Sequence, residues 1–323
     1  MFDIQKTRRL HELAGKHKSG GVGIIPDLLC VRKHMDESHV KYGEWKKFSR
    51  FDHAKMFGFV SAPQLIRQHN NVMKHVNVWC HPFRKQKKIM HRDGCHYQLL
   101  PESDFMDAEY VFRSEAKVKY DFFYMTVNAK AGIEHKGLNE FIDCLPVICG
   151  KMKLRGLIIV YYPAQGSNRL NVLTSERKRT LSHYDKFLTF NWGWLKQPAL
   201  AAAMASCRFG FFPNQVDCSP RIIPECLVRD RPVLLNKKIW GGWHYVNEHT
   251  GSFINFDDSE TWQPALEFMM SHRFSPMENF MSNFGFARSA ARLAEYLGEH
   301  FEHVKEYSHV YFRPYKQIIE RLC

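Results

Sequence analysis

The chain has 323 residues, of which 45% are hydrophobic and 14% aromatic, so it can bury a sizeable core and is excluded from the disordered class. Its 46 Lys and Arg residues outnumber its 33 Asp and Glu residues. The resulting formal charge of +13 indicates anionic partners such as nucleotide phosphates, membrane surfaces, nucleic acid or acidic glycans.

The first third of the chain mixes basic helical segments with short apolar strands. Residues 1–20 are basic and helix-like, and Gly20 and Gly21 then form a glycine-rich turn whose backbone amides can approach a phosphate. The elements that we expect next are a strand over residues 55–60, a helix over 61–71 that begins with Ser and Pro, and a strand over 76–79.

The second part of the chain alternates regularly between strands and helices. Residues 84–117 are polar and turn-rich, which favours a connection between domains. Repeated strand–helix units after it predict a parallel, doubly wound sheet. We expect strands over residues 120–127, 157–162, 187–191, 209–213 and 232–236, and helices over 136–149, 197–206, 222–228, 262–270, 284–302 and 311–322.

Nine cysteines are spread along the chain without a C-x-x-C pair, which is atypical of a disulfide framework. We interpret them as mostly buried thiols in a reducing compartment. The first 20 residues lack the apolar core of a signal peptide, and no apolar run approaches the length of a membrane span. We therefore expect a cytoplasmic protein without a transmembrane segment.

Two acidic residues stand eight positions apart, Asp217 in the loop after a strand and Glu225 in the helix that follows it. The loop at the carboxyl end of a parallel strand is where open α/β sheets bind ligands. The first N–H groups of the next helix are unpaired and attract oxygen atoms. The two carboxylates are thus placed to accept hydrogen bonds from ligand hydroxyl groups. The alternative is that Asp217 ends a turn and Glu225 is solvated.

The Asp217-x7-Glu225 spacing, set inside strand–loop–helix–strand, resembles the E-x7-E signature of family-4-type retaining glycosyltransferases, with Asp in place of the first Glu. The resemblance implies the GT-B fold, an α/β architecture of two Rossmann-like domains with parallel sheets. We expect a short acceptor-side domain over residues 1–117, a nucleotide-sugar-binding domain over 118–305, and a helix over 306–323 that packs back on the first domain. The first domain is short for a GT-B half, so its early strands are expected to be trimmed.

The same resemblance implies roles for single residues. Asp217 would contact the transferred sugar and Glu225 the ribose. Lys130 and Lys136 stand where relatives carry an Arg and a Lys on the donor diphosphate, and Lys136 is followed by Gly as in the family. Fixed cations at the departing diphosphate accelerate transfer, because the negative charge there is larger in the transition state. The alternative is two solvated lysines in a lysine-rich chain.

Further donor-binding candidates follow from the resemblance. Trp192 and Gly193 lie in the loop that would hold the nucleotide base, and Trp192 or Trp194 would offer that base a flat face. Arg221 stands at the expected helix start, where it can bond a phosphate or pair with Asp217. No Asp-x-Asp motif or zinc-type Cys spacing occurs, so we expect no metal and no cofactor beyond a UDP- or GDP-linked sugar substrate. The full set of donor-binding candidates is Glu225, Arg221, Trp192, Gly193, Ser219, Gly20 and Gly21.

The implied reaction transfers a hexosyl or pentosyl group from a nucleotide-diphosphate donor to a hydroxyl of a glycan, glycoprotein or glycolipid, with retention of configuration. Similar compact transferases occur in large algal viruses and protists, which suggests such an origin. One alternative is an inverting, exostosin-like enzyme whose general base would be Asp27, Asp52 or a histidine of the first domain. Another is a non-catalytic nucleic-acid-binding protein, which the dispersed basic residues disfavour. The charge also fits peripheral membrane contact.

Overall fold

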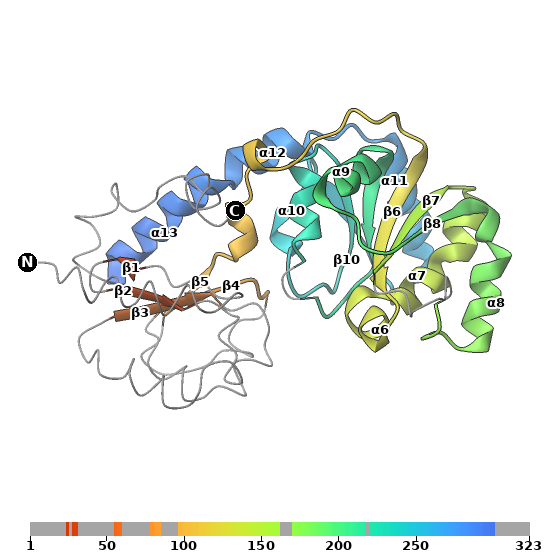
Figure 1. Ribbon diagram of the computed structural model, residues 1–323, viewed down its shortest axis with the longest axis horizontal. Coiled ribbons are helices and arrows are strands. Elements are labelled where there is room, and N and C mark those ends of the chain that lie inside the picture. The colour runs from red at the N-terminus through yellow and green to blue at the C-terminus, as the bar shows by residue number, and fades with distance from the viewer. Residues whose placement is uncertain are drawn as a thin grey trace, which may run out of the picture. The chain divides into compact units, whose positions relative to one another are not determined.

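The computed structural model describes residues 24–25, 28–31, 55–59, 78–84, 96–161, 170–217 and 220–300. The chain divides into two compact units (Figure 1). One comprises residues 1–105 together with 286–323, and the other comprises residues 106–285. The sequence instead favoured boundaries after residues 117 and 305. Helix α13 (Phe286–His300), which the sequence placed in the second domain, is therefore part of the first unit in the structure.

The first unit contains a five-stranded sheet whose strands follow chain order. The first two strands are antiparallel and all later neighbours are parallel. The strands are β1 (Ile24–Ile25), β2 (Leu28–Val31), β3 (Lys55–Phe59), β4 (Val78–His81) and β5 (His96–Leu99). Strand β5 lies in the segment whose sequence favoured a connection between domains. It was not predicted, because its sequence HYQL lacks an apolar pattern. The helices expected over residues 1–20, 61–71 and 311–322 lie outside the described residues.

Helix α13 is tied to η1 (Glu102–Phe105) within the first unit. Arg292 donates a hydrogen bond to the buried carboxylate of Asp104 over 2.8 Å, and the Ser289 hydroxyl donates to the Asp104 carbonyl oxygen over 2.8 Å. The ring of Phe286 packs edge-on against Phe105. These contacts join two segments that are almost 200 residues apart in the sequence.

The second unit is a six-stranded, wholly parallel sheet. Its spatial order is β11-β10-β9-β6-β7-β8, the order of a doubly wound Rossmann sheet. The expected α/β fold with parallel sheets is therefore confirmed. The strands are β6 (Tyr120–Val127), β7 (Gly156–Tyr161), β8 (Leu188–Trp192), β9 (Cys207–Phe212), β10 (Val233–Asn236) and β11 (Gly251–Ile254).

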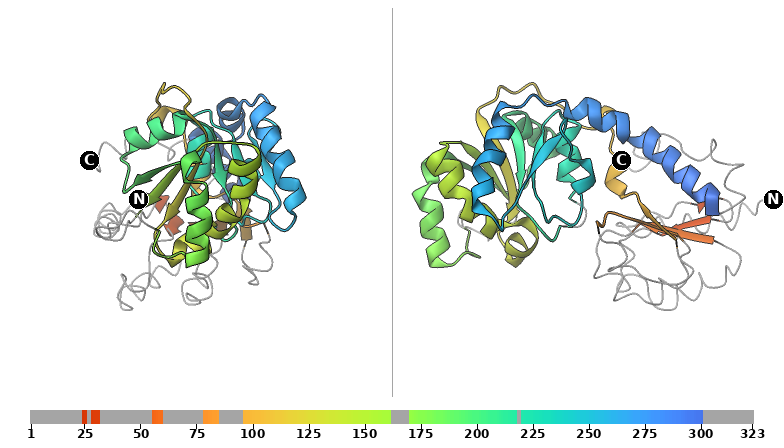
Figure 2. Two further views of the ribbon diagram at one scale, coloured as in Figure 1. Left: turned by 90° about the vertical axis from the view of Figure 1, so that its right-hand side faces the viewer. Right: turned by 180° about the vertical axis from the view of Figure 1, so that it is seen from behind.

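Helices cover both faces of this sheet (Figures 1 and 2). Adjacent side chains of the central strand point to opposite faces, so Phe122 enters one core and Phe123 the other. The first core is closed by α7 (Leu138–Leu145), η3 (Pro146–Lys151) and α11 (Trp262–Ser271), and the second by α9 (Gln197–Ala205), α10 (Ile222–Leu227) and α12 (Pro276–Asn283). The unit also contains α6 (Lys130–Lys136) and α8 (Ser175–His183).

The helix predicted over residues 136–149 differs in the structure. Helix α6 ends at Lys136, and α7 begins at Leu138. Between them Gly137 adopts a left-handed conformation with φ of 66°, which ends the first helix as a C-cap glycine does. The prediction began one helix at residue 136 and missed α6, because the sequence KAGIEHK has little apolar pattern.

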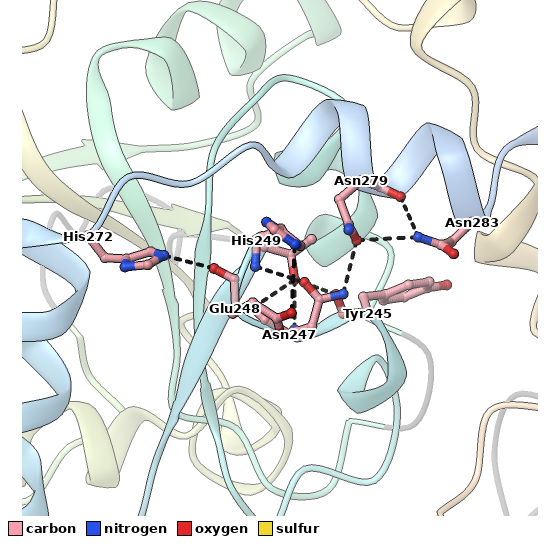
Figure 3. Close-up of polar contacts among 8 residues, drawn as sticks. Tyr245, Asn247, Glu248, His249, His272, Asn279 and Asn283 are labelled. Carbon is pink, nitrogen blue, oxygen red and sulfur yellow. Dashed lines mark hydrogen bonds and ion pairs between the residues drawn. The ribbon is translucent and has the colours of Figure 1, made fainter.

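The turn before β11 is held to α12 by asparagine side chains (Figure 3). Asn247 donates to the side-chain oxygen of Asn279 over 3.0 Å, and Asn283 donates to the carbonyl oxygen of Asn279 over 2.9 Å. A ring nitrogen of His272, which follows α11, lies 3.0 Å from the carbonyl oxygen of Glu248. Two helices outside the sheet are thereby fixed to its edge. No helix in the described part of the chain combines the length and the apolar character needed to cross a bilayer.

Candidate functional site

The candidate site lies where the strand order reverses, between β6 and β9. At such a point the loops leaving the carboxyl ends of the two strands diverge and open a crevice for ligands. Here β6 leads into α6, and β9 leads into the loop that carries Asp217. The ammonium Nζ of Lys136 lies 2.6 Å from Oδ2 of Asp217. Two residues predicted from separate parts of the sequence, the diphosphate-binding lysine and the first acid of the motif, are therefore in direct contact, with side chains 37% and 14% exposed.

The backbone around Lys136 is held in place by β6 and by the loop after β9. Its carbonyl oxygen accepts a hydrogen bond from the buried hydroxyl of Tyr124 over 2.9 Å. Helix α6 starts tightly against the sheet, because a Cβ on Gly132 would lie 2.1 Å from the carbonyl oxygen of Val127. On the other side, a Cβ on Gly137 would lie 2.6 Å from the backbone nitrogen of Asn214. The turn that follows Lys136 thus packs directly on the loop that carries Asp217.

The loop that carries Asp217 is fixed by β10 and the segment after it. The side chain of Asn236 donates to the carbonyl oxygen of Pro213 over 2.9 Å. The backbone N–H of Gly241 donates to the carbonyl oxygen of Asp217 over 3.1 Å, and that of Trp240 donates to Gln215 over 3.0 Å. The loop that carries the Asp217 carboxylate is therefore fixed by hydrogen bonds to its backbone, which is typical of a preorganised site.

Glu225 lies in α10 and belongs to a buried network centred on Arg229. Nη1 of Arg229 lies 3.4 Å from Oε2 of Glu225 and donates to the Glu225 carbonyl oxygen over 2.8 Å. Its Nη2 donates to the side chain of Gln197 over 3.1 Å, and its Nε donates to the carbonyl oxygen of Phe112 over 2.9 Å. With its side chain 3% exposed and every nitrogen bonded, Arg229 is a structural cation.

Burial raises the pKa of the Glu225 carboxyl above its ordinary value, and the charges of Arg229 and Arg221 offset part of that rise. Burial also raises the pKa of Tyr161 to about 12, and the charge of Glu225 contributes to this shift. Tyr161 ends β7. The Glu225 carboxylate therefore lies close enough to Tyr161, at the carboxyl end of β7, for its charge to act there.

The aromatic pair after β8 is split between core and surface. Trp192 stacks on Phe190, with ring centroids 5.4 Å apart and planes at 17°, and packs against the core. Gly193 follows with φ of 113° and nothing within 4 Å of where a Cβ would stand. Trp194 is 72% exposed and lies 5.0 Å from the ring of Tyr161. Of the two tryptophans that the sequence offered, Trp194 thus presents the more accessible flat face.

The other two predicted cations, Lys130 and Arg221, are exposed. Lys130 lies in the first turn of α6, has a side chain that is 84% exposed, and pairs with Glu134 over 3.0 Å. Arg221 is exposed just before α10. The candidates Ser219, Gly20 and Gly21 and the alternative bases Asp27 and Asp52 lie outside the described residues. Within the described ranges, no three His, Cys, Asp or Glu side chains gather as a metal site.

Sequence reasoning missed the residues that position the site. Arg229 stands four positions after Glu225 in a predicted helix, and this i,i+4 spacing is a signal that could have identified the pair. Asn236 ends a predicted strand at the carboxyl edge of the sheet, where functional side chains gather. Tyr124 and Gln197 carry no sequence signal, because their partners are 12 and 32 residues away.

No protein-family model matches the chain, and no curated protein matches it either. Among solved structures, sucrose-phosphate synthase from Thermosynechococcus elongatus is 11% identical, and the match covers 93% of this chain and 77% of that chain with a TM-score of 0.62. The apo structure of OtsA is also 11% identical, with 91% and 78% covered and a TM-score of 0.61.

The pneumococcal O-GlcNAc transferase GtfA, solved in complex with UDP and GlcNAc, is 9% identical with a TM-score of 0.58. That match covers 84% of this chain but only 56% of GtfA. The chain likewise spans about half of TarM, at 52% of its length. At these identities the likeness concerns the fold alone. The structural neighbours are GT-B glycosyltransferases, so the GT-B fold expected from the sequence is confirmed.

Proposed function

We propose that this protein is a glycosyltransferase that moves a hexosyl or pentosyl group from a UDP- or GDP-linked donor to a hydroxyl of a glycan, glycoprotein or glycolipid. The observation that carries the proposal is the 2.6 Å contact between Lys136 and Asp217 at the switch point of the Rossmann-ordered sheet. Two structural neighbours support the donor class, since GtfA was solved with UDP and an E. coli trehalose-6-phosphate structure with UDP-2-fluoro glucose.

The chemistry assigns one role to each member of the pair. Breaking the bond between the sugar and the diphosphate places negative charge on the departing diphosphate. The Lys136 ammonium stabilises that charge, and its effect is larger in the transition state than in the bound donor. The Asp217 carboxylate accepts hydrogen bonds from sugar hydroxyl groups and keeps the ammonium oriented. We assign retention of configuration, with a phosphate oxygen of the leaving group taking the acceptor proton.

The remaining donor contacts extend from this pair. The Glu225 carboxylate binds the ribose hydroxyls, and Arg229 holds it in place from the protein side. The base stacks on Trp194, and Gly193 leaves its backbone open to it. Lys130 exchanges Glu134 for the diphosphate and acts as a second cation. Because the two lysines and unpaired N–H groups neutralise the diphosphate, the proposed mechanism is metal-independent.

The first experiment is a thermal-shift series with UDP-, GDP-, ADP- and TDP-sugars, because a ligand that binds the native state raises the unfolding temperature. One UDP- or GDP-sugar is expected to stabilise the wild type. Asp217→Asn removes the charge that pairs with Lys136 but keeps the shape, and it should reduce that shift. Lys178→Met, an exposed lysine on α8, is the matched control and should shift like the wild type.

The second experiment measures turnover with the stabilising donor. Lys136→Met should lower kcat by about 100-fold or more, the typical effect of deleting one preorganised charge stabiliser. Lys130→Met should have a smaller effect, because its side chain is 84% exposed and pairs with Glu134. Analysis of the product anomer tests retention. Wild-type turnover in both Lys136→Met and Asp217→Asn would refute the site.

A further inference from the structure

The edge of the second unit's sheet opposite the candidate site is strongly basic. Four adjacent strands, in the order β9-β6-β7-β8, begin along this edge. Neighbouring parallel strands are about 4.8 Å apart, so these four starts span roughly 14 Å. The cations at or just before the strand starts, all exposed, are Lys117, Lys119, Lys151, Lys153, Arg155, Lys186 and Arg208. We call this set the amino-edge surface.

Backbone hydrogen bonds show that the strand starts are level with one another. The N–H of Lys119 donates to Ser206, the residue before β9, over 2.8 Å. The N–H of Asp121 donates to Arg155, the residue before β7, over 2.8 Å. The register also pairs Gly156 with Leu188 at the start of β8. The backbone positions of the seven cations therefore lie along one edge of the sheet, which favours a broad face.

The positive charge of this face is only partly compensated. Asp121 is occupied by the face itself, because its carboxylate pairs with Arg208 over 3.4 Å and accepts from the backbone N–H of Arg155 over 2.8 Å. The other nearby carboxylates are Glu115 and Asp185, both exposed. Seven cations against three carboxylates leave a formal charge of +4. A concentration of like charges destabilises the folded unit, so an anionic partner would relieve it.

The aromatic rings of the face distinguish between kinds of anionic partner. Lys153 and Lys186 lie over the ring of Phe187 at 6.0 and 5.3 Å, and Arg155 lies over Tyr120 at 6.0 Å. Rings covered by cations are not open platforms for nucleic-acid bases, which single-stranded nucleic acid requires. Lysines over partly buried rings do suit a membrane surface, where long stems lie on apolar groups and the charged ends reach the headgroups.

We propose that the amino-edge surface binds the anionic headgroups of a lipid bilayer and docks the protein peripherally on it. An exposed apolar side chain, Val118 at 48% exposure, lies between Lys117 and Lys119 and adds contact at the interfacial depth. Because the candidate site lies at the opposite edge of the same sheet, docking leaves the site open. The binding needs no donor, so it is tested independently of the proposed transferase activity.

The experiment is co-sedimentation of the full chain with vesicles of phosphatidylcholine alone or with phosphatidylserine. The wild type should bind only the anionic vesicles, and salt should weaken the binding. The variant Lys117→Glu, Lys119→Glu, Lys186→Glu changes three exposed lysines of the amino-edge surface. It should lose about 100-fold or more in affinity, from the usual contribution of each basic residue at an anionic surface.

The matched control is Lys178→Glu, Arg179→Glu, Arg273→Glu, which changes the net charge equally at exposed positions elsewhere in the unit. It should bind nearly as tightly as the wild type. Equal losses in both triple variants, or equal wild-type binding to neutral vesicles, would overturn the proposal, as would preferential binding to single-stranded RNA. If the glutamate variant unfolds at a lower temperature, the corresponding glutamine variant must show the same selective loss.

Discussion

The hydroxyl of Tyr124 donates a hydrogen bond to the carbonyl oxygen of Lys136 over 2.9 Å, from the central strand to the last residue of α6. The Tyr124 ring is 1% exposed and stacks on Phe141 of α7, with centroids 4.4 Å apart and planes at 20°. Burial raises the pKa of Tyr124 well above its ordinary value, so the hydroxyl stays protonated and donates. The hydrogen bond from β6 thus fixes the position of the Lys136 backbone, from which the side chain extends.

Tyr124→Phe is expected to lower stability by about 1–2 kcal/mol, because it leaves the carbonyl oxygen of Lys136 without this donor. It should also lower kcat while the KM for the donor changes less, since a displaced ammonium loses most where the charge develops. Urea denaturation and steady-state kinetics check the two effects. On a Lys136→Met background the kcat effect should vanish; a full additional loss there would show that Tyr124 acts by another route.

Gly137 is required by conformation and by space together. Its φ of 66° disfavours a side chain, and a Cβ would lie 2.6 Å from the backbone of Pro213 and Asn214. Gly137→Ala is expected to cost about 2–4 kcal/mol, since backbone strain and overlap with a fixed backbone combine. Thermal or urea unfolding measures this cost. Donor affinity should fall too, because the overlap pushes the Asp217 loop away from Lys136.

The matched control is Gly193→Ala, where φ is also positive, at 113°, but nothing lies within 4 Å of the added Cβ. It should show the backbone cost alone, so its loss of stability is expected to be the smaller of the two. A larger loss in Gly193→Ala than in Gly137→Ala would mean that steric contact with the Asp217 loop contributes little.

The doubly wound sheet was predictable because its strands are buried on both faces. Such strands appear as continuous apolar runs, and the run over Tyr120–Val127 gave β6 its observed bounds. The eight-residue spacing of Asp217 and Glu225 likewise pointed to a loop and a helix at the carboxyl edge, where the structure has them. Short strands with mixed residues, such as Gly251–Ile254, gave no such signal.

The positioning contacts were not predictable, because they depend on tertiary packing. Two tryptophans stand two positions apart in one short segment, yet Trp192 packs against the core and Trp194 faces solvent. Only the twist of the chain at Gly193 separates them. Similarly, Arg229 looks like a solvated helix end in the sequence, while the fold buries it among partners from three segments. The spacing of apolar residues predicts which face of a helix is buried, but it does not predict the burial of a residue at the end of the helix.

Glu225 is expected to make stability depend on pH. Its pKa is raised in the folded state by burial, so the folded protein binds the proton more tightly than the unfolded chain. Its contribution is therefore fully present below the ordinary value of 4.5 and is lost as pH rises through the folded pKa. Glu225→Gln should flatten this part of the stability profile. Burial raises the pKa of Glu140 in the same direction, so Glu140→Gln should remove a further part.

Donor affinity is expected to depend on the same carboxyl in the opposite sense. Ribose hydroxyls donate to a carboxylate, so binding is full above the raised pKa of Glu225 and weakens as pH falls through it. Calorimetric titration with the stabilising donor across this range measures the change. Glu225→Gln should bind more weakly and with little pH dependence. An unchanged pH profile in Glu225→Gln would exclude Glu225 from the donor contacts.

The two tryptophans after β8 should separate binding from stability. Trp194 is 72% exposed, so Trp194→Ala is expected to leave the unfolding temperature nearly unchanged. It should weaken donor binding by about 10-fold or more, the usual effect of removing one ring that stacks on a base. Trp192 packs against Phe190 and the core, so Trp192→Ala should cost about 3 kcal/mol or more in stability.

The comparison is decisive because the two rings differ in burial but not in chemistry. Donor titrations and thermal unfolding of both variants are measured under the same conditions, with Trp194→Phe as the conservative replacement. Phenylalanine keeps a flat face toward Tyr161, so Trp194→Phe should recover most of the affinity lost in Trp194→Ala. If Trp194→Ala binds the donor as tightly as the wild type, the base does not stack there, and the donor must enter the site from another side of Gly193.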